Sequence, residues 1–163
     1  ATTEIYTLSQ HDALPISNVV GLDQIDALMD QSIEGNVFKW VDAVFEGHLK
    51  LSQMQRTALI EQGEAPLKLL FMLHRNLRQL YKVKLLLDEG YTQTTLAEQL
   101  SLKPFVVKKS IQQLARFDRI GLASAMDGMV QADQWMKSSS MTPELLLDYA
   151  VGQILINAKS ATR

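Results

Sequence analysis

Residues 63–87 read GEAPLKLLFMLHRNLRQLYKVKLLL and carry the longest helical pattern in the chain. Leucines recur there at steps of three, four and seven residues, on one side of a helix: Leu70, Leu73, Leu77, Leu80 and Leu87. Pro66 suits a first helical turn and Gly90 suits the position just past a helix end. We therefore expect one long amphipathic helix over about 66–89, with its leucines in a core.

Outward from this segment, turn signals divide the chain into further pieces of helical length. Each piece repeats its apolar residues at three and four, and no useful run alternates with period two. The expected helices cover residues 22–32 (ending near Gly35), 37–47 (with Asn36 as N-cap), 51–62, 92–100, 104–117, 122–137 (set off by Gly121), and a last one capped by Thr142 and started by Pro143. The pattern predicts an all-α fold, a helical bundle.

Composition narrows the class of protein. The 163 residues contain no cysteine, which excludes disulfides, thiolate metal sites and a cysteine nucleophile and fits a reducing, cytoplasmic setting. The 47% apolar and 21% charged residues are typical of a globular chain, and no apolar run is long enough to predict a membrane span. The net charge of −2 shows no basic excess of the kind common in nucleic-acid-binding proteins.

The first residues show a sequence pattern unlike that of the rest. Residues 1–16, ATTEIYTLSQHDALPI, are similar to one translated frame of a DNA-sequencing adapter, with Gln10 where the adapter encodes leucine. We interpret residues 1–17 as an adapter artefact and leave them out of fold reasoning. We expect the natural protein to continue upstream.

No catalytic, cofactor or metal site is expected from the motifs. His48 and His74 lack a second ligand at metal-binding spacing, and no glycine-rich phosphate loop occurs. Carboxylates such as Asp42 and Asp118 are interpreted as solvated helix faces or caps. For all of these histidines and carboxylates we favour a structural or surface role.

Two basic clusters leave alternatives open. Arg75, Arg78 and Lys82 form a stripe on the long helix that can meet an acidic partner, a phosphate backbone or only water. Residues 94–114, TTLAEQLSLKPFVVKKSIQQL, have the residue spacing of a helix-turn-helix. In such a motif Lys103, Lys108 and Lys109 would face the phosphates of DNA. A plain helical hairpin explains the same pattern, and only Gln112 and Gln113 would read bases.

The order of segments resembles the C-terminal part of the delta subunit of bacterial DNA polymerase III, a component of the sliding-clamp loader. The matching stretches are NVFKWVDAVFEG (36–47), GEAPLKLLFMLHRNLRQLYKVKLLL (63–87), LSLKPFVVKKSIQQLARF (100–117) and LASAMDGMVQADQWMKSSSMTPELLLDYAVGQIL (122–155). Their order and spacing make the resemblance specific.

The resemblance implies a domain organisation and partners. Residues 36–157 would be the helical collar domain, residues 18–35 the end of a lid-like helical domain, and 158–163 a frayed terminus. The collar would join the other loader subunits, tau/gamma and delta prime, in a five-membered ring of a DNA polymerase complex, without catalysing a reaction or binding a cofactor. The sliding clamp would be gripped only by an N-terminal domain upstream. DNA contact is expected only within the complex, and membrane contact is not expected.

Overall fold

The computed structural model describes residues 22–138 and 141–159, with side chains described from residue 33 onward. These ranges contain seven helices and no strand, which confirms the all-α prediction. The helices are α3 (Leu22–Glu46), α4 (Leu49–Glu61), α5 (Pro66–Asp88), α6 (Gln93–Gln99), α7 (Pro104–Leu114), α8 (Arg119–Ser138) and α9 (Pro143–Asn157). The adapter-like residues 1–17 lie outside the described residues, so that interpretation remains a prediction. No described helix combines the length and apolarity needed to cross a bilayer.

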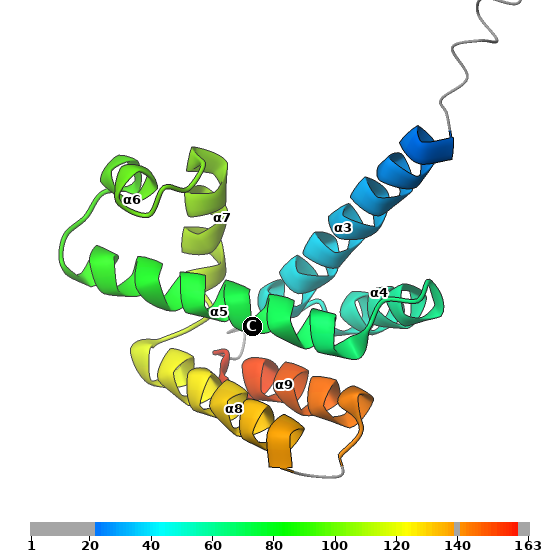
Figure 1. Cartoon of the computed structure of the whole chain (residues 1–163). Helices are drawn as coiled ribbons and strands as arrows, with labels where there is room; N and C mark the ends of the chain where they lie inside the picture. Colours follow the sequence, from blue (N-terminus) through cyan, green and yellow to red (C-terminus); the bar gives the residue numbers. More distant parts are fainter. Residues whose placement is uncertain (1–21, 139–140, 160–163) are drawn as a thin grey trace, which may run out of the picture. The chain divides into compact units, whose positions relative to one another are not determined.

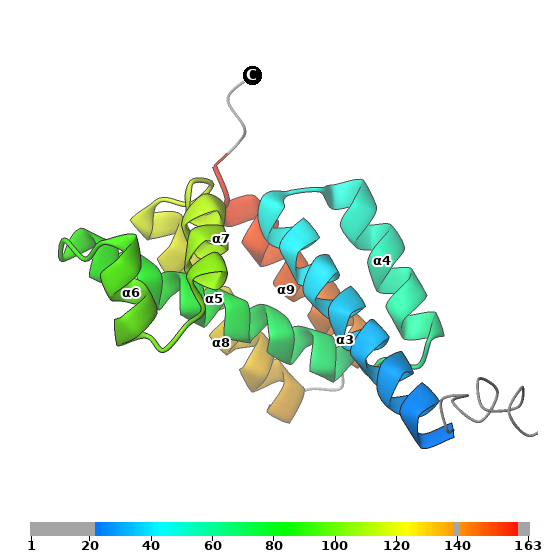
Figure 2. The ribbon, with the colours of Figure 1, turned by 90° about the horizontal axis from the view of Figure 1, so that it is seen from above.

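The chain separates into two units, one ending at Gly35 and the other beginning at Asn36, and the second holds the end of α3 and all of α4 to α9. Helix α5 is its centre. The α6–α7 pair lies along one side of α5 and the α8–α9 pair along the other (Figure 1), and α5 contacts α7, α8 and α9 directly. Figure 2 gives the same arrangement from above.

The leucine stripe predicted on the central helix is the core of this unit. Leu73, Leu77 and Leu80 are fully buried and Leu70 nearly so, whereas Leu87 is only partly buried against the same cluster. Trp40 and Phe45 of α3 join the core, as do Leu122 of α8 and Leu147 of α9. Truncating a leucine in such a packed site costs about 2–5 kcal/mol, so this stripe accounts for much of the stability of the fold.

Four helices end in the same hydrogen-bonded cap. After each last turn, a residue with positive φ donates to the carbonyl three residues back and the next residue donates five residues back, which is the Schellman pattern. Gly47, Gly63 and Gly90 hold that position after α3, α4 and α5, where glycine has no Cβ to clash. After α6 the position is held by Ser101, at φ 51°.

Two glycines expected to separate helices lie inside them instead. Gly35 and Asn36 are within α3, which runs without a break from Leu22 to Glu46, so the N-cap assigned to Asn36 is wrong. A helix-interior glycine costs only about 1 kcal/mol, too little to end a helix that the apolar stripe of residues 37–45 continues.

Gly121 is the second case. It lies in the first turn of α8, where its N–H donates to Asp118 Oδ1 at 2.7 Å. Asp118 therefore caps α8, in agreement with the sequence prediction. A Cβ at position 121 would collide with the backbone carbonyl of Asn157, so glycine permits the end of α9 to approach the start of α8.

Candidate functional site

A shallow groove lies between α5 and the turn that joins α6 to α7. Its volume is about 250 Å³. Three basic side chains of α5, the predicted stripe, line it together with apolar and polar neighbours: Phe71, His74, Arg75, Arg78, Gln79, Lys82, Leu100 and Leu102. We call this the basic groove.

The stripe is a geometric consequence of helical spacing. With about 100° per residue, Arg75, Arg78 and Lys82 fall within an arc of roughly 60° on α5. Phe71, one turn earlier, falls inside the same arc. The opposite face of the helix carries the buried leucines, so these side chains must point outward.

The turn that forms the other wall is held by backbone geometry. The N–H of Leu102 donates to the carbonyl of Ala97 at 2.9 Å and that of Ser101 donates to Glu98 at 3.2 Å. The left-handed conformation of Ser101 is what allows this turn to close. As a result Leu100 and Leu102 lie partly buried at the groove's wall.

The charges of the basic groove are uncompensated by carboxylates. All three basic residues are exposed, and none of them forms an ion pair or a side-chain hydrogen bond with another described residue. Five other basic side chains do form ion pairs: Lys68 with Glu64, Lys84 with Asp88, Lys109 with Asp42, Lys137 with Asp133, and Arg56 with Asp148. The groove therefore presents three free cations in one row.

His74 lies at the edge of the same groove. Burial lowers its pKa from the usual 6.5, and the positive charge of Arg78 lowers that pKa further, while Asp133 acts in the opposite direction. The imidazole is therefore neutral at neutral pH and adds no charge to the groove. From the sequence, His74 could be described only as a histidine on the flank of a helix, and nothing marked its position at the groove.

A smaller and mainly apolar hollow, which Asp133 also lines, adjoins the basic groove. Its volume is about 80 Å³, and it lies between α5 and α8. Phe71 and His74 line both hollows, while Leu67 and Met136 line only the smaller one. Leu67 is 41% exposed, Phe71 64% and Met136 38%. Apolar and cationic surface are thus continuous along one helix.

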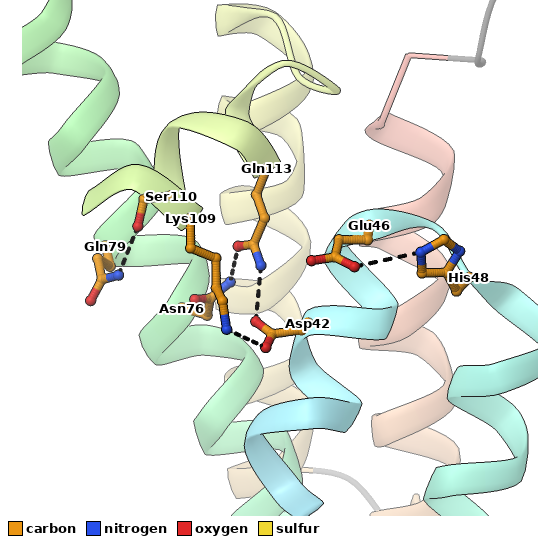
Figure 3. A network of polar contacts seen from close by, with 8 residues as sticks. All are labelled: Asp42, Glu46, His48, Asn76, Gln79, Lys109, Ser110 and Gln113. Atoms are coloured by element: carbon orange, nitrogen blue, oxygen red, sulfur yellow. Dashed lines mark hydrogen bonds and ion pairs between the residues drawn. The ribbon is translucent and has the colours of Figure 1, made fainter. Parts of the chain in front are cut away.

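The helix-turn-helix lysines are not equivalent. Lys103 and Lys108 are exposed, but Lys109 donates from Nζ to Asp42 Oδ2 at 2.6 Å (Figure 3). Gln113, considered a base-reading residue, is 2% exposed and donates from Nε2 to Asp42 Oδ1 at 3.0 Å. Asp42 is therefore part of a polar network and not the solvated carboxylate expected from the sequence.

That network ties three helices together (Figure 3). Asn76 of α5 donates to Gln113 Oε1 at 3.1 Å, and Gln79 donates to the buried Ser110 Oγ at 2.9 Å. The partners are separated by 31 to 71 residues in sequence. No local pattern could have predicted these pairings.

Within residues 22–138 and 141–159, no group of three or more metal-ligating side chains could hold an ion. The basic groove contains no carboxylate. Its chemistry suits recognition of an anion or an acidic surface.

The comparisons with known proteins agree with the sequence resemblance. A family profile described as "DNA polymerase III delta subunit, C-terminal domain" matches residues 34–154. The chain belongs to the DNA polymerase III delta subunit family. A curated relative, DNA polymerase III subunit delta of Bacillus subtilis, is 26% identical over 136 residues. A solved structure, the Bacillus subtilis DNA clamp loader delta protein, matches with a TM-score of 0.68 at 26% identity.

The delta-family match concerns one part of a longer protein. The aligned region covers 83% of this chain but 39% of the curated relative, and 83% of this chain but 40% of the solved one. The chain thus spans about two fifths of the relatives it matches. What it shares with them is the C-terminal helical domain of the delta subunit.

Proposed function

We propose that this delta-family domain is the collar of a clamp-loader subunit, a non-catalytic domain that joins neighbouring subunits while the sliding clamp is loaded for DNA replication. The observation that carries the proposal is the family match over residues 34–154. The partners would be the tau/gamma and delta prime subunits. Contact with the clamp would require the N-terminal domain of the full subunit.

The surface of the bundle supports this role. Its apolar stripes are used in the core, yet several large apolar side chains remain on the outside. Leu49, Leu51 and Met54 are about half exposed or more on α4, and Ile120 and Ile156 are each more than three quarters exposed. Exposed apolar groups of this size gather where proteins meet. Arg75, Arg78 and Lys82 would add a charged contact to such an interface.

A pull-down tests the proposal. The tagged chain is mixed at micromolar concentration with purified tau/gamma and delta prime subunits. We expect the tagged chain to retain at least one of these subunits. A tagged helical protein of unrelated sequence is the control. Recovery of no loader subunit from a folded chain would contradict the proposal.

A DNA-binding regulator is the competing function, and Lys103 and Lys108 are the observation behind it. In that function the two lysines, with Lys109 if it left Asp42, would contact phosphates. Duplex DNA titration then gives binding that falls steeply with salt and weakens in the Lys108→Glu variant. Absence of salt-dependent duplex binding by the isolated chain would exclude this function and leave the collar proposal intact.

A further inference from the structure

We propose that the outer face of α5 binds an amphipathic helix from a neighbouring loader subunit. That helix would carry carboxylates at one end and apolar side chains at the other. The inference rests on the collar function and names the chemistry of the partner. It concerns the surface of Leu67, Phe71, Arg75, Arg78 and Lys82, which we call the α5 stripe.

The order of side chains along the α5 stripe determines the order along the partner. Leu67 and Phe71 come first, and the cations of residues 75, 78 and 82 follow toward the end of α5. From residue 67 to residue 82 the stripe is about 22 Å long, the length of roughly four helical turns. A partner helix of about 15 residues would cover it.

The apolar half offers packing for a side chain of the partner. Phe71 is 64% exposed and lies at the junction of the basic groove and the apolar hollow that Met136 also lines. A leucine or phenylalanine of the partner could occupy this hollow and shield the Phe71 ring from water. The neutral state of His74 favours such apolar contact at this point.

The charged half offers three cations with no carboxylate partner among the described residues. Carboxylates placed one turn apart on a helix match this row, because both helices repeat every 3.6 residues. Acidic residues are favoured in the first turn of a helix, so the partner would run antiparallel to α5 with its acidic end over Lys82.

A protein segment fits this surface better than a nucleic acid. The row has only three cations, the chain as a whole carries a net charge of −2, and Phe71 and His74 are the two aromatic side chains that line the basic groove. Single-stranded nucleic acid is normally held by a longer basic track and by several stacking side chains. The apolar walls from Leu100 and Leu102 also match aliphatic partners.

The test uses the full-length subunit assembled with the other loader subunits. A photo-reactive p-benzoylphenylalanine replaces Phe71, and the crosslinked peptide is identified by mass spectrometry. We expect it to lie in a helix of a neighbouring subunit that carries carboxylates one to three turns from the crosslinked residue. Crosslinks to DNA, or to a segment without carboxylates, would overturn the inference.

Charge reversal provides the second readout. The Arg75→Glu, Arg78→Glu, Lys82→Glu triple variant should weaken association on the order of 100-fold at low salt, because three exposed attractions become repulsions. The matched control is Lys39→Glu, Lys108→Glu, Lys159→Glu, which changes the same charge at other exposed lysines that form no ion pair and should have little effect. Changing the carboxylates of the captured partner helix to lysine should restore binding of the first variant.

The outcomes separate this inference from the collar proposal. Failure of the wild-type subunit to assemble would contradict both. Normal assembly, with equal effects of the two triple variants, would overturn the α5 inference alone. Circular dichroism of both variants checks that the fold is retained.

Discussion

Removing the carboxylate of Asp42 should cost far more stability than removing its ionic partner. In Asp42→Ala, the Nε2 of Gln113 loses its acceptor, and because Gln113 is 2% exposed no water replaces it readily. A buried donor without a partner costs about 1–3 kcal/mol. The side chain of Lys109 is 44% exposed and can turn to water, so that half of the interaction contributes at most about 1 kcal/mol. The expected total is about 1–4 kcal/mol, with the larger part from Gln113.

Lys109→Met provides the matched comparison. It removes the same ion pair but leaves Gln113 bonded to Asp42, so we expect a loss of only about 0.5–1 kcal/mol. Asp42→Asn keeps an oxygen acceptor for Gln113 and should fall between the two. Chemical denaturation followed by far-UV circular dichroism measures the free energy of unfolding for each variant. A Lys109→Met variant as unstable as Asp42→Ala would refute the reasoning.

Three further predictions concern a glycine pair, a histidine and a turn. Gly128→Ala on α8 should lower the free energy of unfolding by about 1–3 kcal/mol, because the new Cβ would lie 2.6 Å from Gln153 Cγ. Gly152→Ala on α9, where nothing lies within 4 Å of the new Cβ, should raise that free energy by about 0.5–1 kcal/mol. Equal shifts of the two melting temperatures would contradict this packing. The folded state disfavours protonated His74, so the unfolded chain binds more protons as pH falls below about 6.5 and the free energy of unfolding declines there. His74→Gln should decline less over the same range than wild type, with His48→Gln as the control for loss of a histidine elsewhere, and an unchanged slope in His74→Gln would refute the assignment. Ser101→Gly should stabilise the chain by about 0.5–1 kcal/mol because it relieves the left-handed backbone after α6, and a lower melting temperature would contradict this.

Local signals predicted the helices well where side-chain periodicity and caps coincide. Pro66 and Gly90 bound α5 as expected, and Thr142 caps α9 through its hydroxyl, which accepts from the N–H of Leu145. The same rules failed at Gly35, where a residue that merely weakens a helix was interpreted as one that ends it. Propensity of about 1 kcal/mol is overridden when the apolar stripe on both sides continues.

The site was predictable only in part. Helical spacing placed Arg75, Arg78 and Lys82 on one face without reference to any other segment. Whether those cations are paired depends on the tertiary fold. The pairing of Lys109 depends on it as well, because its partner Asp42 lies 67 residues away in the sequence. Contacts of that separation leave no periodic trace in the sequence, so the network around Gln113 and the wall formed by the turn at Ser101 became visible only in the folded chain.

Sedimentation velocity of the fluorescently labelled chain, titrated with purified tau/gamma and delta prime subunits, tests the central claim most directly. If this domain is the collar, its boundary should shift to that of a heavier complex at micromolar concentrations of the partners, with saturation at a fixed stoichiometry. A folded chain that continues to sediment alone throughout the titration would contradict the account.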